Sequence, residues 1–387
     1  AKLARRRAFW ALNSLPARMR REGYGSWPNW FARKTRGQLR LLARDHLAEM
    51  AQRFEGADFA SLAADVAEAD ARRDDRHRWI RDALRVAAAA LASHPPATGD
   101  QAVREQALLL LDFPLNVRRS RHWRVHVGRF YQRCMARALD EIAHTRVREG
   151  LHVWKMYNMG FVVKSARHCV GFDIHPGSRR TGPLSAHQQD RLAGMLDAAL
   201  VSHLHFDHLH AGFLRRMLAA GKQIVLPPTL RPGLKGRNVH RVYGRRAGLT
   251  RIGKLSVRSL PGWQRLLTRN NVYVVDIDGH RVLHNGDNTR HGVYYRVSEL
   301  GPIDVILANC WSGFGQWDHL SEAQLLITGH ENELSHVVSM RAPFRRTYAK
   351  VRRMGLLPEG LDAPSAAGPD CRVLSWGEGL RWRSTRA

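Results

Sequence analysis

The sequence changes character near Leu151, and this change limits the folds that the chain can adopt. From this point on, short runs rich in β-branched and aromatic residues alternate with helical segments. The run LHVWKMYNMGFVVKS is typical of a β-hairpin with Asn158 and Gly160 at its turn. Strands and helices that alternate, with polar loops after the strands, predict a layered α/β sandwich over residues 151–387. Functional side chains are then expected on the loops at one edge.

Apolar runs that end in polar residues mark the other strands of this region, and an amphipathic segment at 211–220 marks a helix between them. The chain between Asp287 and His330 has room for one further helix and one strand. The expected strands are 199–203, 223–228, 255–260, 271–279, 281–287, 304–310, 325–330 and 371–376.

The first 150 residues have the period of amphipathic helices instead. One long helical stretch stops at Pro95, as proline requires. The sequence therefore predicts an α-helical N-terminal domain or layer, residues 1–150, that packs on or shields the domain formed by residues 151–387. Helical segments are expected at 36–55, 59–92, 101–112 and 126–147.

The cysteine pattern favours a protein of a reducing compartment. Four cysteines lie far apart, and none belongs to a CxxC pair: Cys134, Cys169, Cys310 and Cys371. This spacing indicates neither a disulfide framework nor a cysteine zinc site, and it favours buried thiols in a cytoplasmic protein. The sequence has no run of about 18 apolar residues, so no spanning helix is expected. The basic and aromatic segment from Arg5 to Trp10 leaves peripheral contact with a membrane open.

The chain is strongly basic, with 62 Lys and Arg residues against 34 Asp and Glu residues and a net charge of +28. The excess is spread over both parts of the chain instead of being gathered in one segment. A generally basic surface is therefore expected, while a groove for nucleic acid is not indicated. Nucleic acid stays an alternative partner. The sequence does not determine the oligomeric state.

A dense group of potential metal ligands follows one of the apolar strands. The segment HLHFDH, residues 203–208, contains three imidazoles and a carboxylate. In an extended segment His203 and His205 point to the same side, because side chains alternate with period two. Asp207 and His208 then turn back as the chain enters a helix. Two such pairs can serve two adjacent metal ions.

The pattern HxHxDH after a strand is the signature of the metallo-β-lactamase superfamily, and the chain resembles this superfamily over residues 151–387. The resemblance implies an αββα sandwich. Asp287, which ends RVLHNGD, resembles the carboxylate that bridges two metal ions, and His330, which closes LLITGH, resembles the last histidine ligand. Asp173 resembles the early aspartate that orients the histidine loop from behind the ligands. The implied metal ligands are His203, His205, Asp207, His208, Asp287 and His330.

The chain departs from the family pattern at one position. The family usually supplies another histidine between the HxHxDH loop and the bridging aspartate, whereas SLPGWQRLLTRNN offers Gln264. A neutral amide oxygen is a poor zinc ligand. The site that contains His203 and His205 is therefore expected to be weak or vacant, with three histidines open as substitutes: His240, His284 and His291. The firm site is made by Asp207, His208, Asp287 and His330.

Loops near the last ligand provide candidate substrate groups. His319 follows Trp317 and Asp318 in WSGFGQWDHL, and His336 closes GHENELSH. His336 is a substrate group, an alternative ligand or a surface or capping residue. Aromatic packing stays open for Trp311 and Trp317.

The resemblance implies a metal-dependent hydrolase in which a metal-bound hydroxide attacks an ester, lactone or phosphodiester. Asp207 is the candidate catalytic residue that accepts a proton. Zinc is the expected cofactor, with Mn²⁺ or Fe²⁺ as alternatives and one or two ions bound. The general pattern is closest to the lactonase and N-acyl-phosphatidylethanolamine phospholipase D branch, which implies a small-molecule or lipid-like ester or phosphodiester substrate. The alternatives are a phosphodiesterase or nuclease acting on nucleic acid and a non-catalytic metal-binding scaffold protein.

Overall fold

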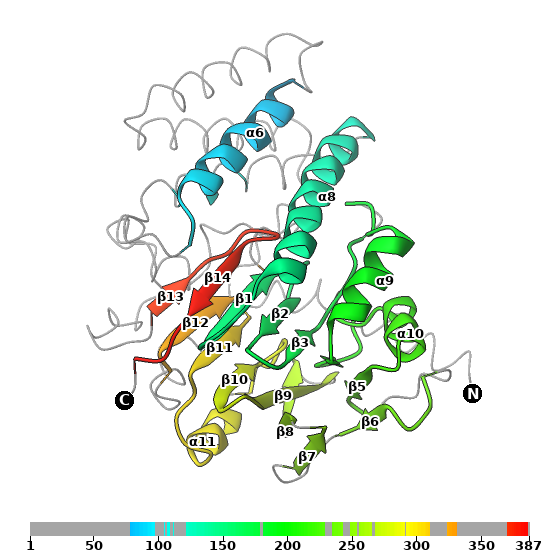
Figure 1. The fold of residues 1–387 in the computed structure, drawn as a ribbon, viewed down its shortest axis with the longest axis vertical. Helices are drawn as coiled ribbons and strands as arrows, with labels where there is room; N and C mark the ends of the chain where they lie inside the picture. Colours follow the sequence, from blue (N-terminus) through cyan, green and yellow to red (C-terminus); the bar gives the residue numbers. More distant parts are fainter. Residues whose placement is uncertain are drawn as a thin grey trace, which may run out of the picture. The chain divides into compact units, whose positions relative to one another are not determined.

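The computed structural model describes most of the chain between residue 121 and residue 309 and shorter parts on either side. All described residues belong to one compact unit, Glu68–Ala387, which is drawn in Figure 1. The described residues are 78–96, 104, 107, 108, 111, 121–178, 181–228, 234–242, 248–253, 255–264, 268–290, 292–309, 323–330 and 370–385.

The first sheet has seven strands in the order β14-β1-β2-β3-β4-β5-β6. The strands from β14 to β3 pair antiparallel, and those from β3 to β6 pair parallel. The β1–β2 hairpin is closed by a hydrogen bond from the Met156 N–H to the Gly160 carbonyl (2.8 Å), as the sequence predicts. The strands are β1 (Leu151–Lys155), β2 (Phe161–Lys164), β3 (Cys169–Phe172), β4 (Ala198–Leu200), β5 (Gln223–Leu226), β6 (Val239–Arg241) and β14 (Gly379–Trp382).

The second sheet also has seven strands, in the order β13-β12-β11-β10-β9-β8-β7. Here the strands from β7 to β10 pair antiparallel, and those from β10 to β13 pair parallel. The strands are β7 (Gly248–Ile252), β8 (Leu255–Gln264), β9 (Thr268–Ile277), β10 (His280–His284), β11 (Val305–Ala308), β12 (Leu325–Thr328) and β13 (Asp370–Arg372).

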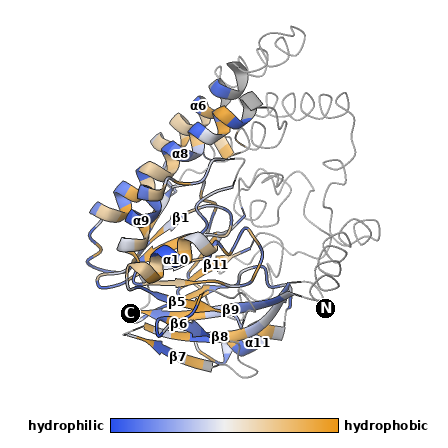
Figure 2. Ribbon diagram, turned by 90° about the vertical axis from the view of Figure 1, so that its right-hand side faces the viewer, coloured by the Kyte–Doolittle hydropathy of each residue, from blue (hydrophilic) through white to orange (hydrophobic). Residues whose placement is uncertain are grey.

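Helices cover the outer face of each sheet. Helix α10 packs on β5 and against α9, and α11 packs on β8, so that the sheets lie between the helices (Figure 2). Helix α9 begins with a capping box in which Ser185 and Gln188 satisfy each other's backbone N–H groups. The αββα sandwich that the sequence predicts is confirmed. The described helices are α6 (Arg78–Ser93), α8 (Arg121–His144), α9 (Ala186–Met195), α10 (Ala211–Ala219) and α11 (Gly292–Ser298).

The apolar side chains of strand β9 show how two cores form. Tyr273, Val275 and Ile277 lie in the core between the sheets. Val272 and Val274 lie in the second core, beneath α11. Side chains alternate across a strand, so a continuous apolar run can fill a core on each face. Each buried Val or Ile side chain contributes about 1.5–3 kcal/mol, and this burial fixes the register on which the functional loops depend.

The sequence missed several elements. Strands β6, β7 and β14 and helix α9 were not expected, because each is short or largely polar and has no clear hydrophobic period. The strand expected at 371–376 pairs only over β13, and the strand expected at 281–287 ends at His284. Helix α8 ends at His144 instead of at residue 147. The helix expected at 36–55 lies outside the described residues.

The first described strand begins at Leu151, and the elements described before this residue are the helices α6 and α8. The described residues of the segment at 101–112 are helical and buried. Both α6 and α8 belong to the same compact unit as the sheets. The division of the chain into domains 1–150 and 151–387 stays a prediction.

One helical residue in this region is tied to the sheets by a buried ion pair. The Arg104 guanidinium donates to both carboxylate oxygens of Glu378, each at 2.8 Å, and also to the Val373 carbonyl at 3.1 Å. The side chains of Arg104 and Glu378 are only 0% and 6% exposed. Because a buried charge needs a partner, this bidentate contact links the helical segment to the turn before β14.

The side chains of two cysteines, Cys134 and Cys169, are described, and both are free thiols. Burial raises the pKa of Cys134 and of Cys169 to about 12, so neither is an activated nucleophile. Among the described helices, none combines the length and the apolar content that crossing a membrane requires.

Candidate metal centre

The HLHFDH loop leaves β4 and turns back on itself. The His208 N–H donates to the His205 carbonyl at 3.1 Å, which closes the turn. Nδ1 of His203 lies 2.9 Å from the Ser202 hydroxyl. His203 and His208 are fully buried, and their ring centroids are 4.0 Å apart. The sequence-based expectation that the loop reverses after its first two histidines agrees with this geometry.

Asp173 holds the loop from behind. Its Oδ1 accepts the Ser202 backbone N–H (2.6 Å), and its Oδ2 accepts the Ser202 hydroxyl (2.5 Å). Oδ2 also lies 2.7 Å from Nδ1 of His208. A proton on Nδ1 between these two groups leaves the lone pair of His208 on Nε2, which points to the opposite side. Asp173 has a φ of 45°, a left-handed conformation that few non-glycine residues adopt and that often marks functional sites.

Asp287 follows β10 in a tight turn built by asparagines. Its N–H donates to the Asn270 side chain at 2.9 Å, and Asn309 Nδ2 donates to the Gly286 carbonyl at 2.8 Å. Gly286 has a φ of 51°, and a Cβ at this position would collide with the side chains of Asn270 and Ser202. Only glycine fits here, so Gly286 allows the Asp287 turn to approach the histidine loop closely.

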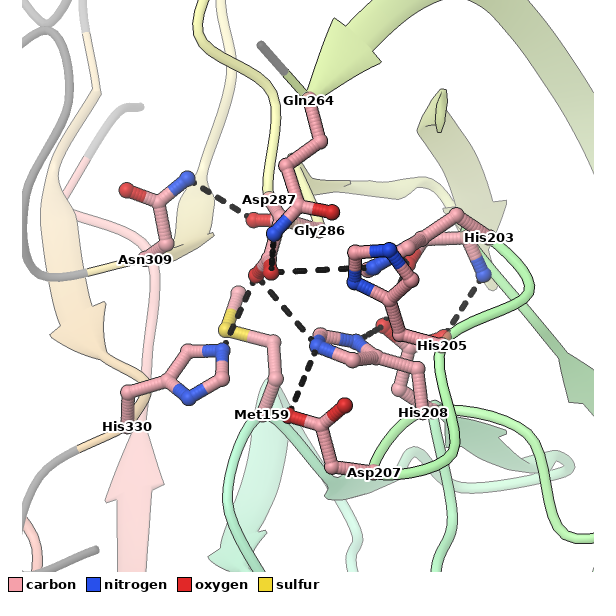
Figure 3. Close-up of polar contacts among 12 residues, drawn as sticks. Met159, His203, His205, Asp207, His208, Gln264, Gly286, Asp287, Asn309 and His330 are labelled. Carbon is pink, nitrogen blue, oxygen red and sulfur yellow. Dashed lines mark hydrogen bonds and ion pairs between the residues drawn. The ribbon is translucent and has the colours of Figure 1, made fainter. Parts of the chain in front are cut away.

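The side chains meet around the Asp287 carboxylate (Figure 3). Oδ1 lies 2.9 Å from Nε2 of His330 and 3.3 Å from Nε2 of His208. Oδ2 lies 3.6 Å from Nε2 of His203. Asp207 Oδ2 is 3.6 Å from Nε2 of His208. His330 follows β12 with a φ of 58°, and its N–H donates to the Asn158 carbonyl in the β1–β2 turn at 3.0 Å.

Two groups of three potential ligands result, and within each the ligand atoms lie within 4.8 Å of one another. We name them the His203 set (His203, His205 and Asp287) and the His208 set (Asp207, His208 and His330). A third group joins Asp173 to His203 and His208. Asp173 contacts His208 through the ring nitrogen that faces away from Asp287, however, so its geometry is that of an orienting residue.

The donor atoms fit a divalent cation. Nε2 of His203 and Nε2 of His208 are buried and form no hydrogen bond within the described part of the chain. Buried polar atoms are rarely left without a partner, and imidazole nitrogens beside carboxylates are the donors that Zn²⁺, Mn²⁺ and Fe²⁺ accept. The six predicted ligands are therefore brought together, while their binding of metal stays a prediction.

Burial and charged neighbours together shift the pKa values of the groups in the site. Burial opposes the charged form of His208, but Asp287, Asp207 and Asp173 outweigh it and hold the pKa of His208 well above its usual value. Burial would raise the pKa of Asp287, yet His208 and His330 hold it well below its usual value. Burial and the neighbouring His208 lower the pKa of His203. His208 and His330 thus favour the charged form of the Asp287 carboxylate.

Gln264 reaches the centre from the end of β8, the place where the family pattern leads one to expect a histidine. Its Nε2–H donates to Oδ2 of Asp287 at 2.6 Å. Its Oε1 is buried and has no hydrogen-bond partner within the described residues. Gln264 pairs with Thr268 across the β8–β9 ladder, and the Thr268 hydroxyl lies 3.5 Å from Nε2 of His205.

Two of the three proposed substitute histidines, His240 and His284, do not join the centre as ligands. His240 lies in β6 and bonds to the Gln223 side chain at 2.8 Å. His284 is buried behind the ligands, 3.3 Å from the Met159 carbonyl and 3.7 Å from Oδ2 of Asp173. In the described part of the chain, neither belongs to a group of potential ligands. Four predicted or alternative site residues lie outside the described residues or have an undescribed side chain: His291, Trp317, His319 and His336.

Sequence reasoning missed the residues that support the ligands. Figure 3 shows the Met159 side chain reaching from the β1–β2 turn toward Asp287 and His330. Its sulfur occupies the space above Gly329, where a Cβ would collide with it. The sequence indicated the turn that contains Met159, but it did not indicate that this turn packs against Gly329 at the end of β12. Ser202 and Asn270 gave no separate signal, because their partners are distant in the chain.

The orienting role of Asp173 leads to a direct prediction. We expect Asp173→Asn to lower the affinity for Zn²⁺ about 10–100-fold, because such partners of ligating histidines typically contribute this much. Asp278→Asn is the matched control, since Asp278 contacts His168 at 2.9 Å in a separate His–Asp pair. Calorimetric titration of metal-free protein measures both affinities. Equal Zn²⁺ affinities for Asp173→Asn and wild type would show that Asp173 does not orient a ligand.

Comparison with known proteins bears on the region that contains most of these residues. The sequence model of the Beta-lactamase superfamily domain matches residues 178–314. Among curated proteins, none matches the chain.

Solved structures with a related fold include three hydrolases of low sequence identity. Igni18, a metallo hydrolase from Ignicoccus hospitalis, has 16% identity and a TM-score of 0.43, over 61% of this chain and 99% of its own. A possible metal-dependent hydrolase from Veillonella parvula has 13% identity and a TM-score of 0.42, over 60% of this chain and 100% of its own. The isothiocyanate hydrolase from Delia radicum gut bacteria has 14% identity and a TM-score of 0.41, over 60% of this chain and 99% of its own. Identities and TM-scores this low say nothing about the substrate of this chain. Residues 178–314, with the HLHFDH loop, Gln264 and Asp287, are similar to the Beta-lactamase superfamily domain.

Proposed function

We propose that this protein is a metal-dependent hydrolase. The observation that carries the proposal is the arrangement of two donor sets around the buried carboxylate of Asp287, with the Nε2 atoms of His203 and His208 at 3.6 Å and 3.3 Å from its oxygens. The similarity of residues 178–314 to the Beta-lactamase superfamily domain supports it. Zn²⁺ is the proposed metal because the donors are imidazoles and carboxylates; Mn²⁺ and Fe²⁺ accept the same donors.

The residues of the site have two proposed roles, metal binding and proton acceptance. A divalent ion held here would polarise a water molecule and the carbonyl or phosphoryl oxygen of a substrate. The side chains of His203, His208 and His330 are at most 1% exposed, while that of Asp207 is 17% exposed. Of the carboxylates in the two donor sets, Asp207 is thus the one most open to solvent, and it would accept the proton of the attacking water. Together with Asp207, Asp287 and the buried histidines would hold the ion.

Phe206 supports a substrate with an apolar part. It lies between His205 and Asp207 and is 81% exposed, although large aromatic side chains are usually buried. An apolar side chain beside the ligands offers a contact for an acyl or alkyl group. We therefore propose an ester, lactone or phosphodiester with an apolar moiety as substrate, in line with the lactonase and phospholipase branch. The cytoplasmic location stays a prediction from the cysteine pattern.

Removing the metal tests this function. We expect a chelator to abolish hydrolysis of a substrate found in a screen of lactones, esters, phosphodiesters and nucleic acids, and added Zn²⁺ to restore it. Metal removal should also lower the melting temperature, because a ligand at about 100 times its Kd stabilises the folded state by about 2.7 kcal/mol. Metal analysis, calorimetry and the screen measure these effects. A purified protein that binds none of the three metals would refute the proposal. Cleavage of nucleic acid alone would favour the nuclease alternative, and metal binding without hydrolysis would favour the scaffold alternative.

A further inference from the structure

The two donor sets meet at Asp287, but they face different oxygens of its carboxylate. Oδ1 is the oxygen near the His208 set, at 2.9 Å from Nε2 of His330 and 3.3 Å from Nε2 of His208. Oδ2 is the oxygen near His203, at 3.6 Å from its Nε2. The carboxylate therefore stands between the sets with one oxygen turned toward each (Figure 3).

Gln264 engages only one of these oxygens. Its Nε2–H donates to Oδ2 at 2.6 Å. An amide NH₂ group is a donor without a lone pair for a metal ion, and it adds no negative charge. If the amide turned over, Oε1 would face Oδ2 at this short distance, and two acceptor oxygens repel each other. Asp287 therefore holds Gln264 with its nitrogen toward the centre.

The two sides consequently differ in charge and in available donors. The His208 set contains two imidazoles and the Asp207 carboxylate, with Oδ1 of Asp287 beside them. The His203 set contains two imidazoles and an Asp287 oxygen that already accepts a hydrogen bond. Zinc sites typically use three or four protein ligands. Oδ1 of Asp287 also has a hydrogen-bonding group beside it, Nε2 of His330 at 2.9 Å, but this imidazole can itself bind a metal ion, whereas the Gln264 NH₂ group beside Oδ2 cannot. The His208 side is the better cation site.

We propose that Gln264 makes the centre unequal, so that one divalent ion binds tightly on the His208 side and a second binds only weakly on the His203 side. The inference rests on the proposed function, because it requires that the protein binds metal. Gln264 is a positioning residue: it holds Oδ2 of Asp287 and withholds the ligand that a histidine would supply.

Counting bound metal in Gln264 variants tests this. Full-length protein is stripped with a chelator, loaded with Zn²⁺ and dialysed, and the remaining Zn²⁺ is counted by elemental analysis. Wild type is expected to keep close to one Zn²⁺ per chain. Gln264→His is expected to keep close to two and to bind the second at least about tenfold more tightly, the lower end of the effect of one supporting partner. Gln264→Leu, of similar volume but without a donor, is expected to stay near one.

A second pair of variants locates the tight ion. Asp207→Ala is expected to lose the dialysis-resistant Zn²⁺, whereas His205→Ala is expected to keep it. These two proteins decide the matter even where Gln264→His does not fold. The inference is overturned by a wild type that keeps two Zn²⁺, by a folded Gln264→His that keeps one, or by the reverse pattern in the Asp207 and His205 variants. A wild type that binds no Zn²⁺, Mn²⁺ or Fe²⁺ overturns the proposed function as well, so the two failures are distinguishable.

Discussion

Replacing His208 and Asp287 together by alanine is expected to empty the metal centre and to reduce hydrolysis to the rate of the uncatalysed reaction. His208 Nε2 and Asp287 Oδ1 lie 3.3 Å apart at the middle of the ligand cluster, and Asp287 contacts both donor sets. Apparent binding free energies of protein zinc sites are on the order of 10 kcal/mol, and removing two ligands at once takes away a large share. Elemental analysis of the purified variant measures the loss.

The matched control is His240→Ala. His240 is also a histidine of the sandwich, but it bonds to Gln223 in the β5–β6 pair instead of to the ligands. We expect this variant to retain its metal and its activity. A double variant of His208 and Asp287 that is as rich in metal as wild type would contradict the proposed centre. Circular dichroism spectra of both variants separate metal loss from unfolding.

Arg104→Ala is expected to lower the free energy of unfolding by about 3–5 kcal/mol, the usual effect of leaving one buried charge without its partner. The Arg104 side chain is 0% exposed and makes two hydrogen bonds of 2.8 Å to Glu378. Removing the guanidinium leaves the Glu378 carboxylate, in the turn before β14, buried without its charged partner. Urea unfolding followed by tryptophan fluorescence measures the change.

Arg191→Ala is the control for this effect. Arg191 pairs with Asp140 at 2.6 Å, but the two side chains are 34% and 61% exposed. Solvent screens such a pair, so its removal should cost no more than about 1 kcal/mol. Similar losses in the free energy of unfolding in the Arg104 and Arg191 variants would show that burial does not increase the contribution of the Arg104–Glu378 pair to stability.

The sequence by itself determined the class of fold and the ligand-bearing loop. HLHFDH holds four potential ligands within one short segment, so local spacing alone shows that His203 and His205 share a side and that the chain then reverses. The period-two runs after Leu151 and the apolar strands likewise predicted the sandwich, because burial on one or both faces of a strand leaves a mark on neighbouring residues. Short polar elements such as β6 and α9 leave no such mark and were missed.

Only the tertiary structure decided which distant residues act together. Asp287 and His330 follow strands β10 and β12, and Gln264 is the last residue of β8. The register of the second sheet brings the three side chains to one edge. The sequence identified Gln264 as a missing ligand, but only the fold shows that it hydrogen-bonds Oδ2 of Asp287 and leaves Oδ1 toward the His208 set. It also shows that His240 and His284 are directed elsewhere. A hydrogen bond between residues far apart in the chain depends on strand pairing and side-chain direction, and neither is written in local spacing.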